Sequence, residues 1–234
     1  MVGLVACGGE DEAMDVVPLD QGRAGELTGG SAGVGGGGAG GVGGTGGTSE
    51  VEVPKHLAPY PEGPYGDNLG SVIANHQFIG WSNPAAVEYD VEQMEPVWMS
   101  DFYDPDGSKN IKLLMINSSA QWCPPCRQEY RHFQNKGTFP EYRAKGVMFL
   151  GSLMENNAYE APRYLDARAW VSTYKVDFPF VIDTSFKLGG LFTMDAIPNN
   201  TLIDTKTMKV IRLMPGGDTD GMLRIIDTEL QKRQ

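Results

Sequence analysis

Two cysteines separated by two prolines form the part of this sequence best suited to chemistry. They occur in the segment Trp122-Cys123-Pro124-Pro125-Cys126. A C-x-x-C pair has two common uses, as a redox-active dithiol or as half of a zinc site. A zinc site needs four ligands, and the three histidines of the chain are not spaced to supply the other two. These are His56, His76 and His132. We therefore predict a redox pair that uses no metal and no cofactor.

The residues around the pair predict a strand before it and a helix after it. The run Ile111–Asn117 is mostly apolar and of strand length, and Pro124–Lys136 is typical of a helix that begins with proline. Cys123 would then stand at a helix N-terminus, where unpaired N–H groups and the helix dipole favour the thiolate. Because only the thiolate attacks a disulfide, Cys123 is predicted to be the exposed nucleophile. Cys126, one turn further along, is predicted to be buried and to resolve the mixed disulfide.

Beyond about residue 70, expected strands alternate with expected helices. The expected strands are Ser71–Gly80, Val97–Tyr103, Ile111–Asn117, Gly146–Leu153, Phe178–Ile182, Thr201–Asp204 and Lys209–Leu213. The expected helices are Pro124–Lys136, Ala158–Lys175, Ser185–Phe192 and Asp218–Gln231. Such alternation implies parallel pairing, and the final hairpin adds antiparallel strands. We therefore predict an α/β fold with a mixed central sheet and helices on both faces.

The stretch from Asn117 to Glu129, Asn-Ser-Ser-Ala-Gln-Trp-Cys-Pro-Pro-Cys-Arg-Gln-Glu, resembles the active-site stretch of the TlpA/ResA-like thioredoxin-fold proteins. The resemblance continues as a pattern from about Gly70 to the C-terminus. It implies a thioredoxin fold, here a redoxin domain, with an N-terminal strand extension and one extra helical insert at residues 158–175. It also implies an extracytoplasmic thiol–disulfide oxidoreductase that acts on protein thiols and exchanges electrons with a membrane or periplasmic redox partner.

The same resemblance suggests roles for four further positions. A cis-proline faces the two cysteines in this fold, and Pro198 occupies the matching place, where it would dock the backbone of the substrate. Trp122 is expected to shield the disulfide, or else only to pack. Glu129 matches an acidic position of the family, and it either influences Cys126 or is a carboxylate on the helix surface. Asn117 stands where thioredoxin itself has a buried aspartate.

Residues 1–54 differ in composition from the rest of the chain. The run Thr28–Ser49 is glycine with small residues and carries no charge, so it cannot offset the entropy of ordering itself. We predict a disordered, acidic and glycine-rich tether over residues 1–54 and one redoxin domain over residues 55–234. The formal net charge is -11 and no basic stripe is present, which argues against nucleic acid as a partner. A monomer is expected.

Cys7 stands apart from the redox pair. Leu4-Val5-Ala6-Cys7 has the form of a bacterial lipobox, in which the cysteine becomes acylated. Only six residues precede Cys7, whereas a signal peptide has an apolar region of about 7–15 residues, so a free cysteine is the alternative. No apolar run is long enough to span a bilayer. We expect an extracytoplasmic protein anchored in the bacterial envelope by lipid, with the outer membrane favoured, or otherwise a periplasmic or secreted protein.

Two other functions remain open from the sequence. A peroxiredoxin-like peroxide reductase shares the fold, but neither Cys123 nor Cys126 lies in the required P-x-x-x-T-x-x-C pattern. A non-enzymatic surface lipoprotein would hold the same two cysteines as a structural disulfide. Their predicted position at a helix start argues against that reading, because this position activates a thiol.

Overall fold

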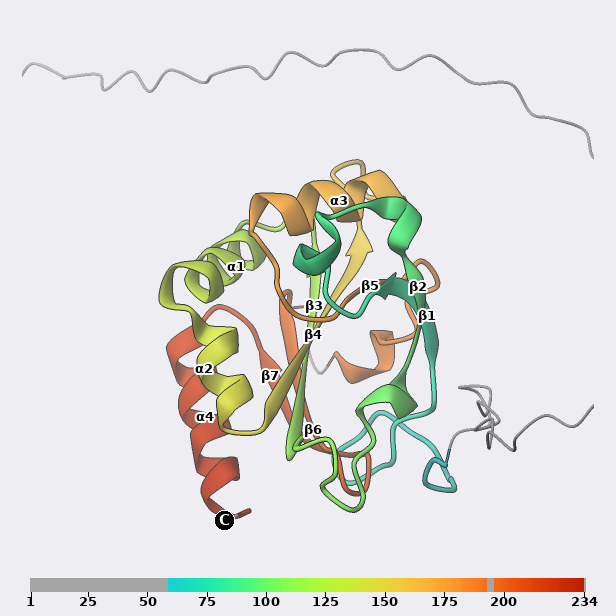
Figure 1. Cartoon of the computed structure of the whole chain (residues 1–234), viewed down its shortest axis with the longest axis vertical. Helices are drawn as coiled ribbons and strands as arrows, with labels where there is room; N and C mark the ends of the chain where they lie inside the picture. The colour runs from blue at the N-terminus through green and yellow to red at the C-terminus, as the bar shows by residue number, and fades with distance from the viewer. Residues whose placement is uncertain (1–58, 193–195, 234) are drawn as a thin grey trace, which may run out of the picture. The chain divides into compact units, whose positions relative to one another are not determined.

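A computed structural model describes residues 59–192 and 196–233 (Figure 1). Its centre is a seven-stranded sheet with the order β2-β1-β5-β4-β3-β6-β7. The strands are β1 (Gln77–Trp81), β2 (Glu95–Trp98), β3 (Leu113–Ala120), β4 (Val147–Glu155), β5 (Phe180–Ile182), β6 (Asn199–Asp204) and β7 (Lys209–Pro215). The β3–β4 and β4–β5 pairs are parallel and the other four pairs are antiparallel. The predicted mixed α/β sheet is confirmed.

Strand β3 positions the two cysteines. It lies between β4 and β6, and all eight of its residues are buried. Burial on both faces is typical of a central strand, and such strands often contain a continuous apolar run. In β3 this run is Leu113–Ile116. The C-terminal end of β3 at Ala120 leads within three residues to Cys123.

Four α-helices accompany the sheet, namely α1 (Pro124–Lys136), α2 (Thr138–Ala144), α3 (Tyr164–Thr173) and α4 (Thr219–Gln231). The predicted bounds of α1 are confirmed. It ends where Gly137 adopts a left-handed conformation with φ 60°, which glycine tolerates best. Asp218 caps α4 by accepting a hydrogen bond from the backbone N–H of Gly221 at 2.8 Å. Helix α2 was not predicted.

The two faces of the sheet are covered differently. On one face, which we call the first face, sheet residues such as Phe149 of β4 form a hydrophobic cluster with residues of all four α-helices. The cluster on the second face includes Leu114 and Ile116 of β3 with residues of two 3₁₀ turns, Met99–Phe102 and Gly189–Leu191. The predicted helix over residues 185–192 is therefore wrong. The consecutive glycines at 189 and 190 disfavour an α-helix, and a 3₁₀ turn covers this face instead.

Several predicted boundaries also differ from the structure, three of them by four residues or more. Helix α3 begins at Tyr164 rather than at residue 158, because the Oδ1 of Asn156 accepts hydrogen bonds from the N–H groups of Ala158 and Glu160 and holds a turn there. Strand β2 ends at Trp98, where a 3₁₀ turn follows. Strand β1 begins at residue 77 rather than at residue 71. The N-terminal strand extension and the extra helical insert, which is α3, are both present.

The predicted tether over residues 1–54, its boundary at residue 55 and Cys7 lie outside the described residues. From residue 59 onward, the described ranges fold around the single sheet. Within these ranges, no helix has both the length and the apolar character needed to cross a bilayer.

Candidate active site

Cys123 and Cys126 form a disulfide at the start of α1, with their Cα atoms 5.3 Å apart. Cys123 is the N-cap residue, and the backbone N–H of Cys126 donates a hydrogen bond to its Sγ at 3.1 Å. Pro124 and Pro125 precede this N–H and have none of their own, so the first N–H of the helix points at the Cys123 sulfur. This donor and the helix dipole would stabilise a thiolate on Cys123 in the reduced protein.

Both cysteines are buried in the disulfide form. Cys123 is 1% exposed and Cys126 is 0% exposed. The predicted exposure of Cys123 is therefore wrong for this form, whereas the predicted burial of Cys126 is confirmed. The carbonyl oxygen of Ile197 lies 3.6 Å from the Sγ of Cys123 and forms part of the surface that covers this sulfur. The spacing of residues around the cysteines in the sequence does not indicate this contact.

The Ile197–Pro198 peptide bond is cis, as the resemblance implied. It lies directly before β6, and the backbone N–H of Gly216 donates to the Pro198 carbonyl oxygen at 2.7 Å. A Cβ atom added at Gly216 would clash with the ring and the carbonyl oxygen of Pro198. Glycine at this position therefore lets the end of β7 lie against Pro198 and fix it beside Cys123.

Glu129 lies one turn after Cys126 in α1 and is only 2% exposed. The Nδ2 of Asn117 donates to its Oε2 at 2.7 Å, and the Nδ2 of Asn200 donates to its Oε1 at 2.9 Å. Asn117 Nδ2 also donates to Asn200 Oδ1 at 2.8 Å, which closes a ring of hydrogen bonds. We call Asn117, Glu129 and Asn200 the polar ring. Ser119 Oγ donates to the free Oδ1 of Asn117 at 2.7 Å, so that amide is fixed from both sides.

The environment of Glu129 suits proton exchange near neutral pH. Burial raises the pKa of its carboxyl to about 7, while hydrogen bonds from Asn200, Asn117 and Thr219 act in the opposite direction. A buried carboxyl with these partners is not a helix-surface group, so that alternative is wrong.

Asn200 was not identified from the sequence. It enters the polar ring because β6 pairs antiparallel with β3 in a register that places it opposite Asn117. That register depends on a pairing between segments far apart in the chain. The available signal was the polar pair Asn199-Asn200, which directly follows Pro198 at the start of β6.

Trp122 is half-buried and is fixed by two contacts. Its Nε1 donates to the Oε2 of Glu155 at 2.7 Å, and its ring stacks on that of Tyr159 at a centroid distance of 5.1 Å. These contacts tie the residue before Cys123 to the segment that joins β4 to α3.

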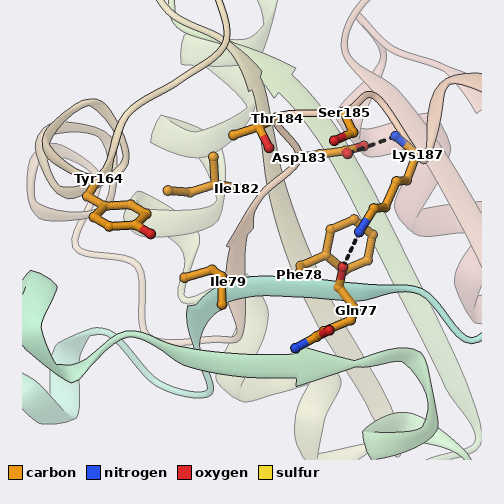
Figure 2. Close-up of a pocket in the computed structure, with 9 residues that line it drawn as sticks. All are labelled: Gln77, Phe78, Ile79, Tyr164, Ile182, Asp183, Thr184, Ser185 and Lys187. Carbon is orange, nitrogen blue, oxygen red and sulfur yellow. Dashed lines mark hydrogen bonds between the residues drawn. The ribbon is translucent and has the colours of Figure 1, made fainter. Parts of the chain in front are cut away.

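The pocket in Figure 2 lies between β1, the end of β5 and the start of α3 and has a volume of about 250 Å³. Its lining contains neither cysteine of the disulfide. Within residues 59–192 and 196–233, no group of His, Cys, Asp and Glu side chains could hold a metal ion. In the described part of the chain, the residues with the geometry for redox chemistry are therefore the disulfide and the groups around it.

Comparisons with known proteins agree with this geometry. The sequence profile of the AhpC/TSA family matches residues 85–212. The chain is 29% identical over 112 residues to the thiol-disulfide oxidoreductase ResA of Bacillus cereus, an alignment that covers 48% of this chain and 60% of the relative. For ResA of Bacillus subtilis the identity is 24% over 112 residues, with 48% and 58% covered. The chain thus spans about three fifths of the length of these relatives.

Solved structures show that the fold is thioredoxin-like. A candidate thiol:disulfide interchange protein DsbE from Chlorobium tepidum superimposes with a TM-score of 0.52 at 20% identity, covering 70% of this chain and 98% of that one. A candidate protein disulfide isomerase from Bacteroides thetaiotaomicron gives a TM-score of 0.50 at 16% identity, with 70% and 91% covered. The predicted thioredoxin fold is confirmed.

Proposed function

Because this chain belongs to the AhpC/TSA family, we propose that it is a thiol–disulfide oxidoreductase that exchanges its Cys123–Cys126 disulfide with the thiols of client proteins. One observation carries the proposal: the disulfide lies at the N-terminus of α1, with the first N–H of the helix directed at Cys123 Sγ. A disulfide with a purely structural role has no need of this donor, whereas an attacking or leaving thiolate is stabilised by it.

The exchange starts from the disulfide form. A client thiolate attacks Cys123 Sγ, a bond forms between these two sulfurs, and Cys126 leaves with the electron pair of the broken disulfide. A second client thiolate then attacks the client sulfur and releases Cys123 as a thiolate. The client loses two electrons and two protons and the protein gains them. In the reverse direction, Cys123 is the nucleophile and Cys126 resolves the mixed disulfide.

Glu129 is the proton-exchanging group for Cys126. Cys126 and Glu129 are both buried and lie three residues apart on α1, so they share one face of the helix, with Cβ atoms about 5–6 Å apart. A pKa of about 7 allows Glu129 to hold or release a proton at neutral pH. Asn117 and Asn200 act as positioning residues, because they hold the two carboxyl oxygens.

Pro198 and Ile197 form the place where the client backbone docks. The Ile197 carbonyl lies beside Cys123 Sγ, and an extended client segment that reaches this sulfur must run past it. Trp122 borders the same approach.

The cellular setting is part of the proposal. Cys7 carries lipid that anchors residues 55–234 in the bacterial envelope through the tether of residues 1–54. Two or three acyl chains would make this anchor stable. The protein is then extracytoplasmic, with the outer membrane favoured, acts as a monomer, and exchanges electrons with a membrane or periplasmic redox protein. Mass spectrometry of the N-terminal peptide from native membranes tests this setting, and an unmodified Cys7 in a fully soluble protein would refute the anchor.

The activity is tested by disulfide exchange with dithiothreitol and then with a reduced two-cysteine peptide. Wild type is expected to react with both, and Cys123→Ser with neither. Cys7→Ser is the matched control because it removes a cysteine outside the pair, and it should exchange like wild type. If the disulfide resists dithiothreitol in the folded protein, its role is structural. If the reduced protein consumes hydrogen peroxide faster than it exchanges with the disulfide form of the peptide, it is a peroxide reductase.

A further inference from the structure

Exposed hydrophobic side chains gather at the end of the sheet where the disulfide lies. Tyr159, Tyr164 and Leu165 are 68%, 55% and 53% exposed; Tyr159 lies in the segment that joins β4 to α3, and the other two are the first residues of α3. Strands β3 and β4 are parallel, so this segment leaves the sheet at the same edge as the Cys123 loop. Large apolar side chains grouped at a surface mark sites of interaction more often than isolated ones do. Together with Trp122, we call these residues the apolar rim.

Hydrogen bonds fix the apolar rim relative to the redox pair. The backbone N–H of Gln121 donates to the Glu155 carbonyl at 3.0 Å, and the side-chain Oε1 of Gln121 accepts from the N–H of Asn157 at 3.2 Å. Its Nε2 donates to the Asp166 carbonyl in α3 at 2.9 Å. Arg127 in α1 donates to the side chain of Asn157 at 3.2 Å. The β4–α3 segment and the start of α1 are therefore joined from both sides of Cys123.

Tyr159 is held in an outward position at some cost. Its φ of 61° is left-handed, which is uncommon for a bulky aromatic residue. The turn formed by Asn156 keeps this conformation, and the N–H of Tyr159 donates to the Asn156 carbonyl at 3.2 Å. The ring is not buried in return, since it lies over Trp122 and stays mostly exposed. A strained residue that presents a large apolar surface beside a reactive group is consistent with a role in recognition.

The pocket in Figure 2 continues the apolar rim away from Cys123. Tyr164 forms one wall, and Ile79 and Ile182 lie next to it. The two charged side chains of the lining are engaged within the protein: Lys187 Nζ donates to the Gln77 carbonyl at 2.6 Å, and the carboxylate of Asp183 accepts from two backbone N–H groups. The part of the pocket beside Tyr164 is thus suited to an apolar side chain.

We propose that the apolar rim and this pocket bind an apolar segment of the client polypeptide next to its reactive cysteine. This inference rests on the proposed function, because the client is defined as the polypeptide that reacts with the Cys123–Cys126 disulfide. Trp122 directly precedes Cys123 and its ring stacks on that of Tyr159, so a client chain joined to Cys123 Sγ lies beside the apolar rim. Formation of the mixed disulfide therefore brings the client into contact with the apolar rim, and the client is the occupant that we assign to it. Clients with leucine or phenylalanine near the cysteine are preferred.

The test compares two single-cysteine peptides, one with leucine and phenylalanine beside the cysteine and one with serine at these places. Each is mixed with the oxidised full chain, and the rate of mixed-disulfide formation is followed by mass spectrometry. In wild type the apolar peptide should react about tenfold faster, which corresponds to about 1.4 kcal/mol, because its large apolar side chains leave water on binding. In the double variant Tyr159→Ser and Tyr164→Ser this ratio should fall to about one.

Matched variants separate apolar area from folding effects. Tyr65→Ser removes an equally exposed tyrosine, 51% exposed, from a segment that bridges through Val72 to Lys209 at the opposite end of the sheet. It should keep the wild-type ratio, as should the conservative double variant Tyr159→Phe and Tyr164→Phe.

A wild-type ratio near one, or a ratio that the serine variants do not change, would overturn the inference while exchange with dithiothreitol still supported the proposed function. Sedimentation provides a second check. If the serine variants convert a dimer into a monomer, a second copy occupies the apolar rim and the inference is wrong. Absence of exchange with dithiothreitol in wild type would instead refute the proposed function.

Discussion

Removing Asn200 should raise the pKa of Glu129. The Nδ2 of Asn200 donates to Glu129 Oε1 at 2.9 Å, and the carboxyl is almost fully buried. In Asn200→Ala this oxygen loses its donor. A donor stabilises the charged carboxylate more than the neutral acid, so its loss favours the protonated form. The sign of the shift is therefore upward.

The size follows from the strength of one hydrogen bond to a charged group. Such bonds contribute roughly 1.5–3 kcal/mol, and one pKa unit corresponds to about 1.4 kcal/mol. Loss of the hydrogen bond from Asn200 thus corresponds to a shift of about one to two pKa units. The Glu129 pKa should rise from about 7 to roughly 8–9.

The direct assay is a ¹³C NMR titration of the Glu129 carboxyl, with the pH dependence of Cys126 alkylation in the reduced protein as a functional readout. Asn199→Ala is the matched control. Asn199 is the neighbouring residue of β6, its Nδ2 donates to Thr201 Oγ1 at 3.2 Å, and adjacent strand residues face opposite sides. This variant should leave the Glu129 pKa near 7. Equal shifts in the two variants, or no shift in Asn200→Ala, would refute the role given to the polar ring.

Three further changes have definite expected outcomes. The folded-state pKa of Glu129 is raised from 4.5 to about 7, so stability from this group is complete below pH 4.5 and declines up to about pH 7. Glu129→Gln should remove this decline, which is worth roughly 3 kcal/mol between pH 4.5 and pH 8 in urea unfolding of the wild type, and an unchanged pH profile would count against the raised pKa. In the reduced protein, iodoacetamide should alkylate Cys123 faster than Cys126 at neutral pH, and the reverse order in peptide mapping would contradict the roles given to them. Gly216→Ala should displace Pro198 and destabilise the fold by about 1–3 kcal/mol while slowing peptide exchange, whereas wild-type behaviour would show that this contact is not needed.

The sequence predicted the elements around the redox pair well because local signals coincide there. An apolar strand, two prolines and a glycine at position 137 together define β3 and α1 with little dependence on distant residues. The last helix was equally clear, because Asp218 is a strong N-cap. By contrast, the helix predicted over residues 185–192 contains the glycines at 189 and 190, which disfavour an α-helix, and part of the segment folds as a 3₁₀ turn.

The surroundings of the cysteines depend on tertiary contacts that spacing does not reveal. Part of the cover over Cys123 comes from Ile197, which is 74 residues away in the chain. The buried state of Glu129 requires both Asn117 and Asn200, which meet only through the pairing of β3 with β6. The resemblance to a known family indicated that Glu129 is relevant, but its partners could be found only in the folded structure.

The central claim is that Cys123 is the sulfur that joins protein to client. The most direct measurement uses Cys126→Ser, which cannot resolve a mixed disulfide, mixed with a two-cysteine peptide in its disulfide form. Peptide mapping by mass spectrometry should find the peptide bound to Cys123 in a stable one-to-one adduct. The reciprocal variant Cys123→Ser should give no adduct at Cys126 on the same timescale, because the first N–H of α1 is directed at the sulfur of Cys123, the N-cap residue, and not at that of Cys126. An adduct at Cys126 in that variant, or none at Cys123 in the first, would contradict the account.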